Sequence, residues 1–541
     1  MTENIKMSGV LLLSLLTTTL MLSDDFLQQI YSVNNHAELE LSYVFVMLAL
    51  NTALWVSGRR WFVLPVIGCF AAMQFLQLAH ISYIGQPLSP VDISRLYSER
   101  SEVSGVVGSA AAEHWPFLLA WGLPYLALVL LFHRFLPTTR RRWAPVAMLA
   151  VIAALASKPQ RAMKFDMIHF MPGPTRSSLH NSLNAFSYYL TRMSFGRDRF
   201  TRLSYAPYRV SPHPVVSPPD HLWIVLGESL RASRMSLYGY QRATTPHLDA
   251  LMQQQKLVAM PGIAMSVATG STIPLFVNGV AEPGNLPALK DKVANLFRLA
   301  KASGYRTFWI SAQESKLLSD TGEQWIDIRS TREDAPLEFS TKGDRALEGR
   351  LDKLLTHRKT FGIIQLRAAH LPYEEAYERD PDFEPPWGRE VSQGDRYDNA
   401  MRYVDESLSR LMAKLIGMPG SHEMIITSDH GQLLGEDGLW GHNRLRPEVA
   451  NVPVIRYAPE RSSADFPRSV MTHADLHAWL AGRLGWQVTT PDRPVGVAWF
   501  HGNEPYGNNL YIRIDRNGWS EPQLLSRLGE SCQGKPVISC L

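Results

Sequence analysis

Five long apolar stretches within the first 157 residues constrain the fold of this 541-residue chain more than any other feature. Each is predominantly apolar, and nearly all are long enough to cross the hydrocarbon core of a bilayer, which takes about 20 residues as a helix. We predict spans at about residues 7–23, 41–56, 61–84, 115–135 and 143–156. The sequence therefore predicts a membrane-embedded domain of five transmembrane helices over residues 1–157.

The charges of the short loops orient these spans. Arginines lie between the second and third spans and between the fourth and fifth, at Arg59, Arg60, Arg134 and Arg140 to Arg142. Cytoplasmic loops carry such an excess of basic residues. The loop after the first span carries acidic residues and no Lys or Arg, which is typical of the opposite side. Five spans then place everything after Ala156 outside the cytosol. If the stretches were buried helices of a soluble protein, the placement of the arginines would be accidental.

Residues 158–219 read as a linker to a soluble domain at residues 220–541. Apolar residues recur in the linker at helical spacing, at Leu179, Leu183, Phe186, Leu190 and Met193. This pattern predicts an amphipathic helix, which either lies at the membrane surface or packs on the soluble domain. Four prolines between positions 212 and 219 place the domain boundary near Asp220.

The soluble half alternates strand-like and helix-like segments. Short apolar runs occupy residues 222–226, 307–311, 361–366, 424–427 and 454–457, with helical patterns such as 289–302, 345–357 and 397–416 between them. Such alternation predicts a mostly parallel sheet with helices on both faces. The formal net charge of +4 is small for this length and gives no argument for nucleic acid as a partner.

Ligand-type side chains follow several of these runs. Glu228 follows the first run, His370 follows FGIIQL, and Asp429 and His430 follow the run at 424–427, with His442 twelve residues beyond His430. The carboxyl ends of parallel strands meet at one sheet edge, where carboxylates and imidazoles suit zinc or manganese. The set could hold one or two divalent metals, although a single strand-end carboxylate more often caps a helix.

A nucleophile is offered by Thr269 in the segment MSVATGSTIP. A threonine hydroxyl at a helix N-terminus and beside a metal is more easily deprotonated. The alternative is that Thr269, Ser271 and Thr272 only cap the helix.

Six segments in fixed order resemble the phosphoethanolamine transferases of the alkaline phosphatase superfamily, which have a sulfatase-like domain. They are WIVLGESLRASRMSLYGYQRATTPHL, ATGSTIP, GYRTFWISAQ, AAHLPY, YDNAMRYVDE and SDHGQLLGEDGLWGHN. The resemblance covers essentially the whole chain and is closest to the branch that modifies the lipopolysaccharide core. It implies an alkaline-phosphatase-like fold in the bacterial inner membrane, with the catalytic domain in the periplasm.

The resemblance also implies roles for the site residues. Glu228, Thr269, Asp429 and His430 would bind one catalytic zinc, with Thr269 as the nucleophile, while His370 and His442 would bind the transferred phosphate or a second zinc. The donor would be phosphatidylethanolamine and the acceptor an envelope glycolipid, such as lipopolysaccharide core or lipid A. Gln313 and Lys316 are candidates to contact the donor head group, or else form an exposed, solvated pair.

Some residues depart from the family pattern. Met265 and Leu275 stand where lipid A-modifying members carry a disulfide beside the nucleophile, which weakens a lipid A assignment. Cys532 and Cys540 could close a small disulfide loop outside the cytosol. Two other functions remain open, a phosphoglycerol transferase of the lipoteichoic acid synthase type and a membrane-anchored scaffold without catalysis.

Overall fold

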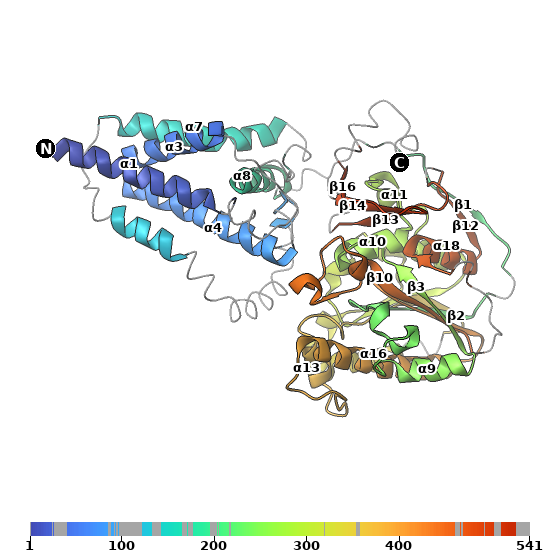
Figure 1. Cartoon of the computed structure of the whole chain (residues 1–541). Coiled ribbons are helices and arrows are strands. Elements are labelled where there is room, and N and C mark those ends of the chain that lie inside the picture. The colour runs from blue at the N-terminus through green and yellow to red at the C-terminus, as the bar shows by residue number, and fades with distance from the viewer. Residues whose placement is uncertain are drawn as a thin grey trace. The chain divides into compact units, whose positions relative to one another are not determined.

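The computed structural model divides the chain into two compact units, a helical unit at Met1–Phe200 and a sheet unit at Thr201–Leu541 (Figure 1). The structure describes residues 2–23, 25, 41–84, 88–90, 92–93, 96, 122–132, 142–164, 170, 177–194, 203, 205–215, 218–318, 320–352, 357–459, 466, 469–491, 493–502, 510–525 and 528. Cys532 and Cys540 lie outside these residues. The predicted domain boundaries at 157 and 219 stay predictions.

The helical unit has a helix in each of the five predicted stretches. These are α1 (Thr2–Met21), α3 (Leu41–Ser57), α4 (Arg60–Ile84), an apolar helix at Gly122–Phe132 and α7 (Ala144–Lys164). Among the described residues, one helix is long and apolar enough to cross a membrane, at Arg60–His80 within α4. Part of the fourth stretch, 115–121 and 133–135, lies outside the described residues, and the crossing of five spans stays a prediction.

Buried polar side chains join α1 to α3 inside the helical unit. Trp55 Nε1 donates to Thr17 Oγ1 at 2.8 Å, and Asn51 Nδ2 donates to Thr18 Oγ1 at 2.9 Å. Each polar group that is buried between apolar helices needs such a partner, because an unpaired one costs free energy. These pairs fix which faces of α1 and α3 meet.

The predicted amphipathic helix is present as α8 (Ser178–Tyr188), which continues into a π-helical turn at Tyr189–Met193. Ser177 caps its N-terminus by accepting from the N–H of His180. The helix packs against α4 and α7, with Leu179 buried and Leu190 exposed. The apolar stripe is therefore covered by other helices of the helical unit at its beginning, at Leu179, and is exposed further along, at Leu190.

The sheet unit is built on eight strands. They are β2 (His221–Gly227), β3 (Leu257–Ile263), β4 (Arg306–Ser311), β5 (Ile328–Ser330), β6 (Thr360–Gln365), β7 (His422–Ser428), β10 (Asn451–Tyr457) and β11 (Met471–Thr472). Their order is β11-β3-β10-β7-β2-β6-β4-β5. All neighbours are parallel except β10, which runs antiparallel to both β3 and β7. The prediction of a mostly parallel sheet is confirmed.

Helices cover both faces of this sheet. Along β2, Leu222, Ile224 and Leu226 pack into one apolar cluster while Trp223 and Val225 pack into another. The apolar cluster with Leu222 includes residues of helices α10 (Thr269–Asn278), α12 (Leu296–Ala302) and α18 (His473–Arg483). The apolar cluster with Trp223 includes residues of helices α9 (Pro246–Gln253), α14 (Ala346–Leu351) and α16 (Gln393–Ile416). A strand buried on both faces is apolar throughout, which is why it appeared as a continuous run.

Two local predictions need correction. The single helix predicted at 289–302 is two helices, α11 (Leu286–Asp291) and α12, because Lys292 takes a left-handed φ of 52° and Asn295 caps the second helix. The helix predicted from Tyr397 begins earlier, at Gln393, where Ser392 and Asp395 form a capping box.

Smaller sheets complete the sheet unit. A strand from the predicted linker, β1 (Arg209–Pro212), pairs with β12 (Trp486–Thr489). Strands β13 (Ala498–His501), β14 (Leu510–Asp515), β15 (Gly518–Trp519) and β16 (Gln523–Leu524) form an antiparallel sheet. Finally β8 (Leu433–Leu434) and β9 (Trp440–Gly441) form a short hairpin just after β7.

Candidate metal centre

Thr269 is the first residue of α10, and its hydroxyl lies where three segments meet. Its Oγ1 atom lies 2.6 Å from Asp429 Oδ2, 3.2 Å from Glu228 Oε2 and 3.4 Å from His430 Nε2. The first N–H groups of a helix have no intrahelical partner and make its N-terminus electropositive. The position therefore favours a negative charge on the oxygen of Thr269 or on a group bound to it.

The two carboxylates follow neighbouring parallel strands. Gly227 and Ser428 are register partners at the ends of β2 and β7, so Glu228 and Asp429, the next residues of each chain segment, lie side by side. The two side chains are almost fully buried. The pairing of β2 with β7 thus brings together residues that are about 200 positions apart.

Several hydrogen bonds fix the carboxylate of Asp429. Its Oδ1 atom accepts from the N–H of Ser229 at 3.0 Å, from the N–H of His430 at 2.7 Å and from the hydroxyl of Ser428 at 3.2 Å. Ser229 has a φ of 58°, a left-handed conformation that is uncommon for a residue with a side chain. Tyr397 on α16 holds this turn by donating to the carbonyl of Ser229 at 2.7 Å. The other carboxylate oxygen of Asp429, Oδ2, accepts the hydrogen bond from Thr269.

Glu228 is fixed by two other donors. The hydroxyl of Ser229 donates to Oε1 at 3.0 Å, and the amide of Gln313 donates to Oε2 at 2.6 Å. Gln313 is itself buried, and its Nε2 atom also donates to the carbonyl of Leu366 at 3.1 Å. Both N–H groups of this amide are therefore used inside the protein.

His430 completes a first cluster with the two carboxylates. Its Nε2 atom lies 3.4 Å from Asp429 Oδ2 and 3.6 Å from Glu228 Oε1. Its Nδ1 atom lies 2.9 Å from the carbonyl of Gly431, which assigns the proton to Nδ1 and leaves Nε2 free to bind a metal. A Cβ atom at Gly431 would lie 2.4 Å from the carbonyl oxygen of Glu448, so this close passage after His430 requires glycine.

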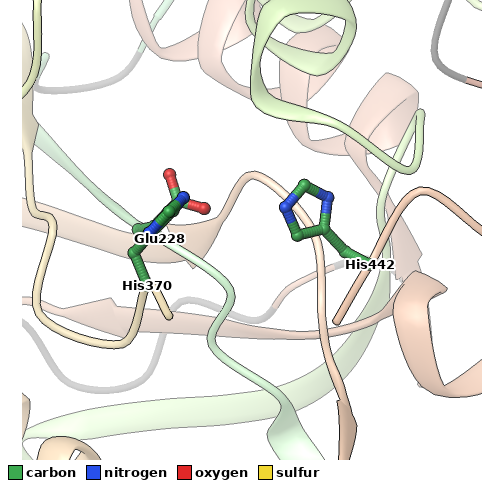
Figure 2. A group of neighbouring side chains, drawn as sticks. All are labelled: Glu228, His370 and His442. Carbon is green, nitrogen blue, oxygen red and sulfur yellow. The ribbon is translucent and has the colours of Figure 1, made fainter. Parts of the chain in front are cut away.

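His370 and His442 form a second cluster that shares Glu228 with the first. The side chains of Glu228, His370 and His442 come from separate segments of the chain (Figure 2), and one ligand atom from each lies within 4.8 Å of the others. The Nδ1 atom of His442 lies 2.9 Å from the carbonyl of Val267, and that of His370 lies 2.5 Å from the carbonyl of Leu371. These contacts leave both Nε2 atoms for a metal or a substrate.

The rings of the three histidines lie close together. The ring of His442 stacks on that of His430 with 4.1 Å between centroids, and it lies 6.5 Å from that of His370. Burial lowers the pKa of His370 and His442 to about 3 and lowers the pKa of His430 as well. All three are therefore neutral near pH 7, which is the form that binds a metal.

The pKa values of the two carboxylates are shifted in opposite directions. Burial opposes ionisation of Glu228, yet the three histidines and the amide of Gln313 bring its pKa to about 2. Burial and the charge of Glu228 raise the pKa of Asp429 well above its usual range. Two buried carboxylates this close together favour a bound cation, which would allow both to ionise.

The site thus contains most of the residues that the sequence predicts for it. Glu228, Thr269, His370, Asp429, His430 and His442 converge, and Gln313 reaches them through Glu228. Lys316 lies in a 3-10 turn at Ser315–Leu318, and its side chain is outside the described residues. The prediction missed Ser229 and Ser428, although a hydroxyl next to a strand-end carboxylate is a signal that could have identified them.

Comparison with known proteins decides the class of this unit. Residues 220–485 match the family model described as Sulfatase, and this range includes all six converging residues. We call this matched range the sulfatase domain.

Two curated proteins are similar to this chain over more than half of its length. Phosphoethanolamine transferase EptC of Escherichia coli (strain K12) is 26% identical over 336 residues, which cover 55% of this chain and 57% of that protein. Kdo(2)-lipid A phosphoethanolamine 7''-transferase of the same strain is 25% identical over 394 residues, which cover 65% of this chain and 66% of that protein. The chain thus matches less than two thirds of the length of either relative.

One solved structure has a similar fold over most of the chain. It is the integral membrane protein lipooligosaccharide phosphoethanolamine transferase A from Neisseria meningitidis, with a TM-score of 0.55 and 17% identity, covering 88% of this chain and 95% of that one. The covered share exceeds the share of the sheet unit, so the likeness includes part of the helical unit as well as the sulfatase domain.

Proposed function

We propose that this protein transfers phosphoethanolamine from phosphatidylethanolamine to an envelope glycolipid, such as lipopolysaccharide core or lipid A. The observation that carries the proposal is the placement of the Thr269 hydroxyl, 2.6 Å from Asp429 at the N-terminus of α10 and beside Glu228 and His430. The names of the two curated relatives support the choice of phosphoethanolamine. The apolar helices of the helical unit would keep the protein in the bacterial inner membrane, with the sulfatase domain in the periplasm.

The residues of the first cluster fit a zinc ion. Two carboxylates, an imidazole nitrogen and a hydroxyl are the ligand types that zinc accepts, and four ligands suit its tetrahedral preference. Glu228, Thr269, Asp429 and His430 would hold this ion, and the second cluster could hold another. A zinc ion bound there supplies positive charge that favours the alkoxide of Thr269 and stabilises the phosphoryl oxygens.

In the first half of the reaction, the oxygen of Thr269 attacks the donor phosphorus. Its proton passes to Asp429 Oδ2, the nearest acceptor. The new bond joins Thr269 Oγ1 to phosphorus, and the bond between phosphorus and the diacylglycerol oxygen breaks. Nε2 of His370 or His442, protonated beside the anionic donor, gives its proton to the departing oxygen. Phosphoethanolamine then remains on Thr269.

In the second half, an oxygen of the acceptor attacks the same phosphorus. If this oxygen is a hydroxyl, the neutral Nε2 of His370 or His442 takes its proton. The bond to Thr269 breaks, and the proton on Asp429 returns to the threonine oxygen. The two histidines therefore exchange protons with the oxygens that leave and enter, and Asp429 exchanges a proton with the nucleophile.

Substitution of the nucleophile tests this proposal. We expect Thr269→Ala to abolish release of diacylglycerol from labelled phosphatidylethanolamine by the purified full chain, whereas Thr269→Ser keeps a hydroxyl and part of the turnover. Mass spectrometry of the wild-type protein should find one phosphoethanolamine group on Thr269. Undiminished turnover by Thr269→Ala would refute the role of Thr269. A phosphoglycerol adduct would show the other transferase activity, and no adduct or turnover would favour a scaffold.

A further inference from the structure

A second feature adjoins the metal centre, a cavity lined by three arginines. Arg332, Arg367 and Arg379 line it together with Asp344, Glu375 and His370. His370 also belongs to the cluster with Glu228 and His442. The side chain of His370 therefore belongs to both the cavity and the second cluster.

The acidic residues of this cavity do not neutralise its arginines. Glu375 contacts the guanidinium of Arg379 through Oε1, and its Oε2 atom lies 4.0 Å from Arg367. Asp344 accepts from the backbone N–H groups of Arg367 and Ala368, at 3.0 and 2.9 Å. The carboxylate of Glu375 is thus shared by two guanidinium groups. The carboxylate of Asp344 accepts hydrogen bonds from backbone N–H groups.

Arg332 differs from the other two arginines, because the guanidinium groups of Arg367 and Arg379 both lie within 4.0 Å of Glu375. Its backbone N–H donates to the carbonyl of Gln313 at 3.1 Å, which places it next to the residue that holds Glu228. Within the described part of the chain, no carboxylate lies within ion-pair distance of its guanidinium. A guanidinium in this state offers several N–H donors to an anion and binds phosphate in a forked geometry.

The donor cannot supply this anion. On the proposed function, phosphatidylethanolamine has one phosphate, and that phosphate must lie at Thr269 for the reaction to occur. Its ethanolamine group is a cation and is repelled by three arginines. An anion in the arginine cavity therefore belongs to the other substrate.

We infer that the cavity of Arg332, Arg367 and Arg379 binds a phosphate group that the acceptor glycolipid already carries, close to the oxygen that receives phosphoethanolamine. The inference rests on the proposed function and assigns this cavity as the place where the acceptor's own phosphate binds. Such a pocket favours phosphorylated acceptors over the same sugars without phosphate.

The test is a binding measurement that does not need turnover. Lipopolysaccharide, the same lipopolysaccharide after chemical removal of its phosphate groups, and phosphatidylethanolamine are each titrated in detergent micelles onto the full chain. We expect Arg332→Gln to raise the Kd for intact lipopolysaccharide about tenfold, as expected for loss of a charged hydrogen bond. Arg332→Lys, which keeps the charge, should restore most of the affinity.

Two controls make the result specific. Arg329→Gln changes a neighbouring arginine whose side chain is 52% exposed and pairs with Glu323, and it should leave every Kd unchanged. Wild-type protein should bind dephosphorylated lipopolysaccharide about as weakly as Arg332→Gln binds the intact form.

Three results would overturn the inference. They are equal affinity of the wild-type protein for intact and dephosphorylated lipopolysaccharide, no effect of Arg332→Gln on intact lipopolysaccharide, or a selective loss of phosphatidylethanolamine binding. The last result would assign the cavity to the donor. Diacylglycerol release is measured separately. If the protein prefers intact over dephosphorylated lipopolysaccharide but releases no diacylglycerol, the proposed reaction is refuted and the phosphate-binding cavity is not.

Discussion

The two clusters that share Glu228 are held in different ways. Asp429 and Glu228 follow neighbouring strands, are almost fully buried and each accept hydrogen bonds from several donors. His370 and His442 lie on loops, are half-buried and each have one backbone carbonyl as the anchor of Nδ1. The first cluster can hold a fixed charge in a fixed geometry, whereas the second can adjust to a substrate that enters and leaves.

The hairpin that carries His442 is itself tied to the sheet unit. Glu436 pairs with Arg231 at 2.5 Å and accepts from the N–H of Leu434 at 2.6 Å. Arg231 in turn donates to the carbonyl of Gln432 at 3.2 Å. The hairpin is therefore positioned by one ion pair and by hydrogen bonds to its backbone, while the strand ends are positioned by the sheet.

The largest effect is expected in the first cluster. Asp429→Asn removes a negative ligand that also accepts the proton of Thr269, so we expect loss of bound zinc and a fall in turnover of about a thousandfold. Metal content is measured by mass spectrometry and turnover by diacylglycerol release. Asp437→Asn is the control, because that side chain is 70% exposed and pairs with Arg446. Full zinc content in Asp429→Asn would contradict a metal site in the first cluster.

The second cluster should respond differently. We expect His370→Asn and His442→Asn to keep the zinc of the first cluster while turnover falls about a hundredfold, because general acid–base groups contribute on that order. The exposed His213→Asn serves as control. Loss of zinc together with turnover would place these histidines among the ligands of the same ion and would remove the contrast between the clusters.

A smaller effect is expected at Gln313, which donates a hydrogen bond to Glu228 of the first cluster. Gln313→Leu removes the donor to Glu228 and should weaken zinc affinity roughly tenfold in a chelator competition assay, as for other residues that orient a ligand. The exposed Gln253→Leu is the control. If Gln313→Leu instead raised the KM for phosphatidylethanolamine at unchanged zinc affinity, Gln313 would contact the donor head group.

The smallest effect concerns the loop that leads to His370. Burial raises the pKa of Asp344 from 3.8 to about 6, despite its hydrogen bonds with the backbone of Arg367 and Ala368. A raised native pKa gives stability that is complete below the unfolded pKa and is lost as pH rises through the native pKa. Between pH 5 and 7.5 the wild type should therefore lose about 1 kcal/mol of unfolding free energy relative to Asp344→Asn.

Urea unfolding of both proteins at the two pH values measures this difference. The other titrating groups are common to both proteins and cancel in the comparison. A constant gap between Asp344→Asn and wild type across this range would show that Asp344 stays ionised.

Local sequence predicted the strands near the site well, and the physical reason is burial on both faces. The runs at 222–226 and 424–427 appear as β2 and β7 with one or two further residues at each end. By contrast β3 was not predicted, because its sequence LVAMPGI contains Pro261 and Gly262, which are unfavourable inside a strand. Pro261 is tolerated opposite Pro453 of β10. Such a pairing is visible only once the two strands are adjacent.

The sequence by itself determined the ligand types at the strand ends and the helix that begins at Thr269, because these depend on apolar runs and the residues that follow them. The order of strands depends on how distant segments pack, and it alone placed β7 beside β2 and so Asp429 beside Glu228. Only the tertiary structure showed that Glu228 belongs to both clusters, that Gln313 is buried behind it and that three arginines line a cavity beside His370. These features arise from contacts between segments that are far apart in the chain, so local sequence patterns do not predict them.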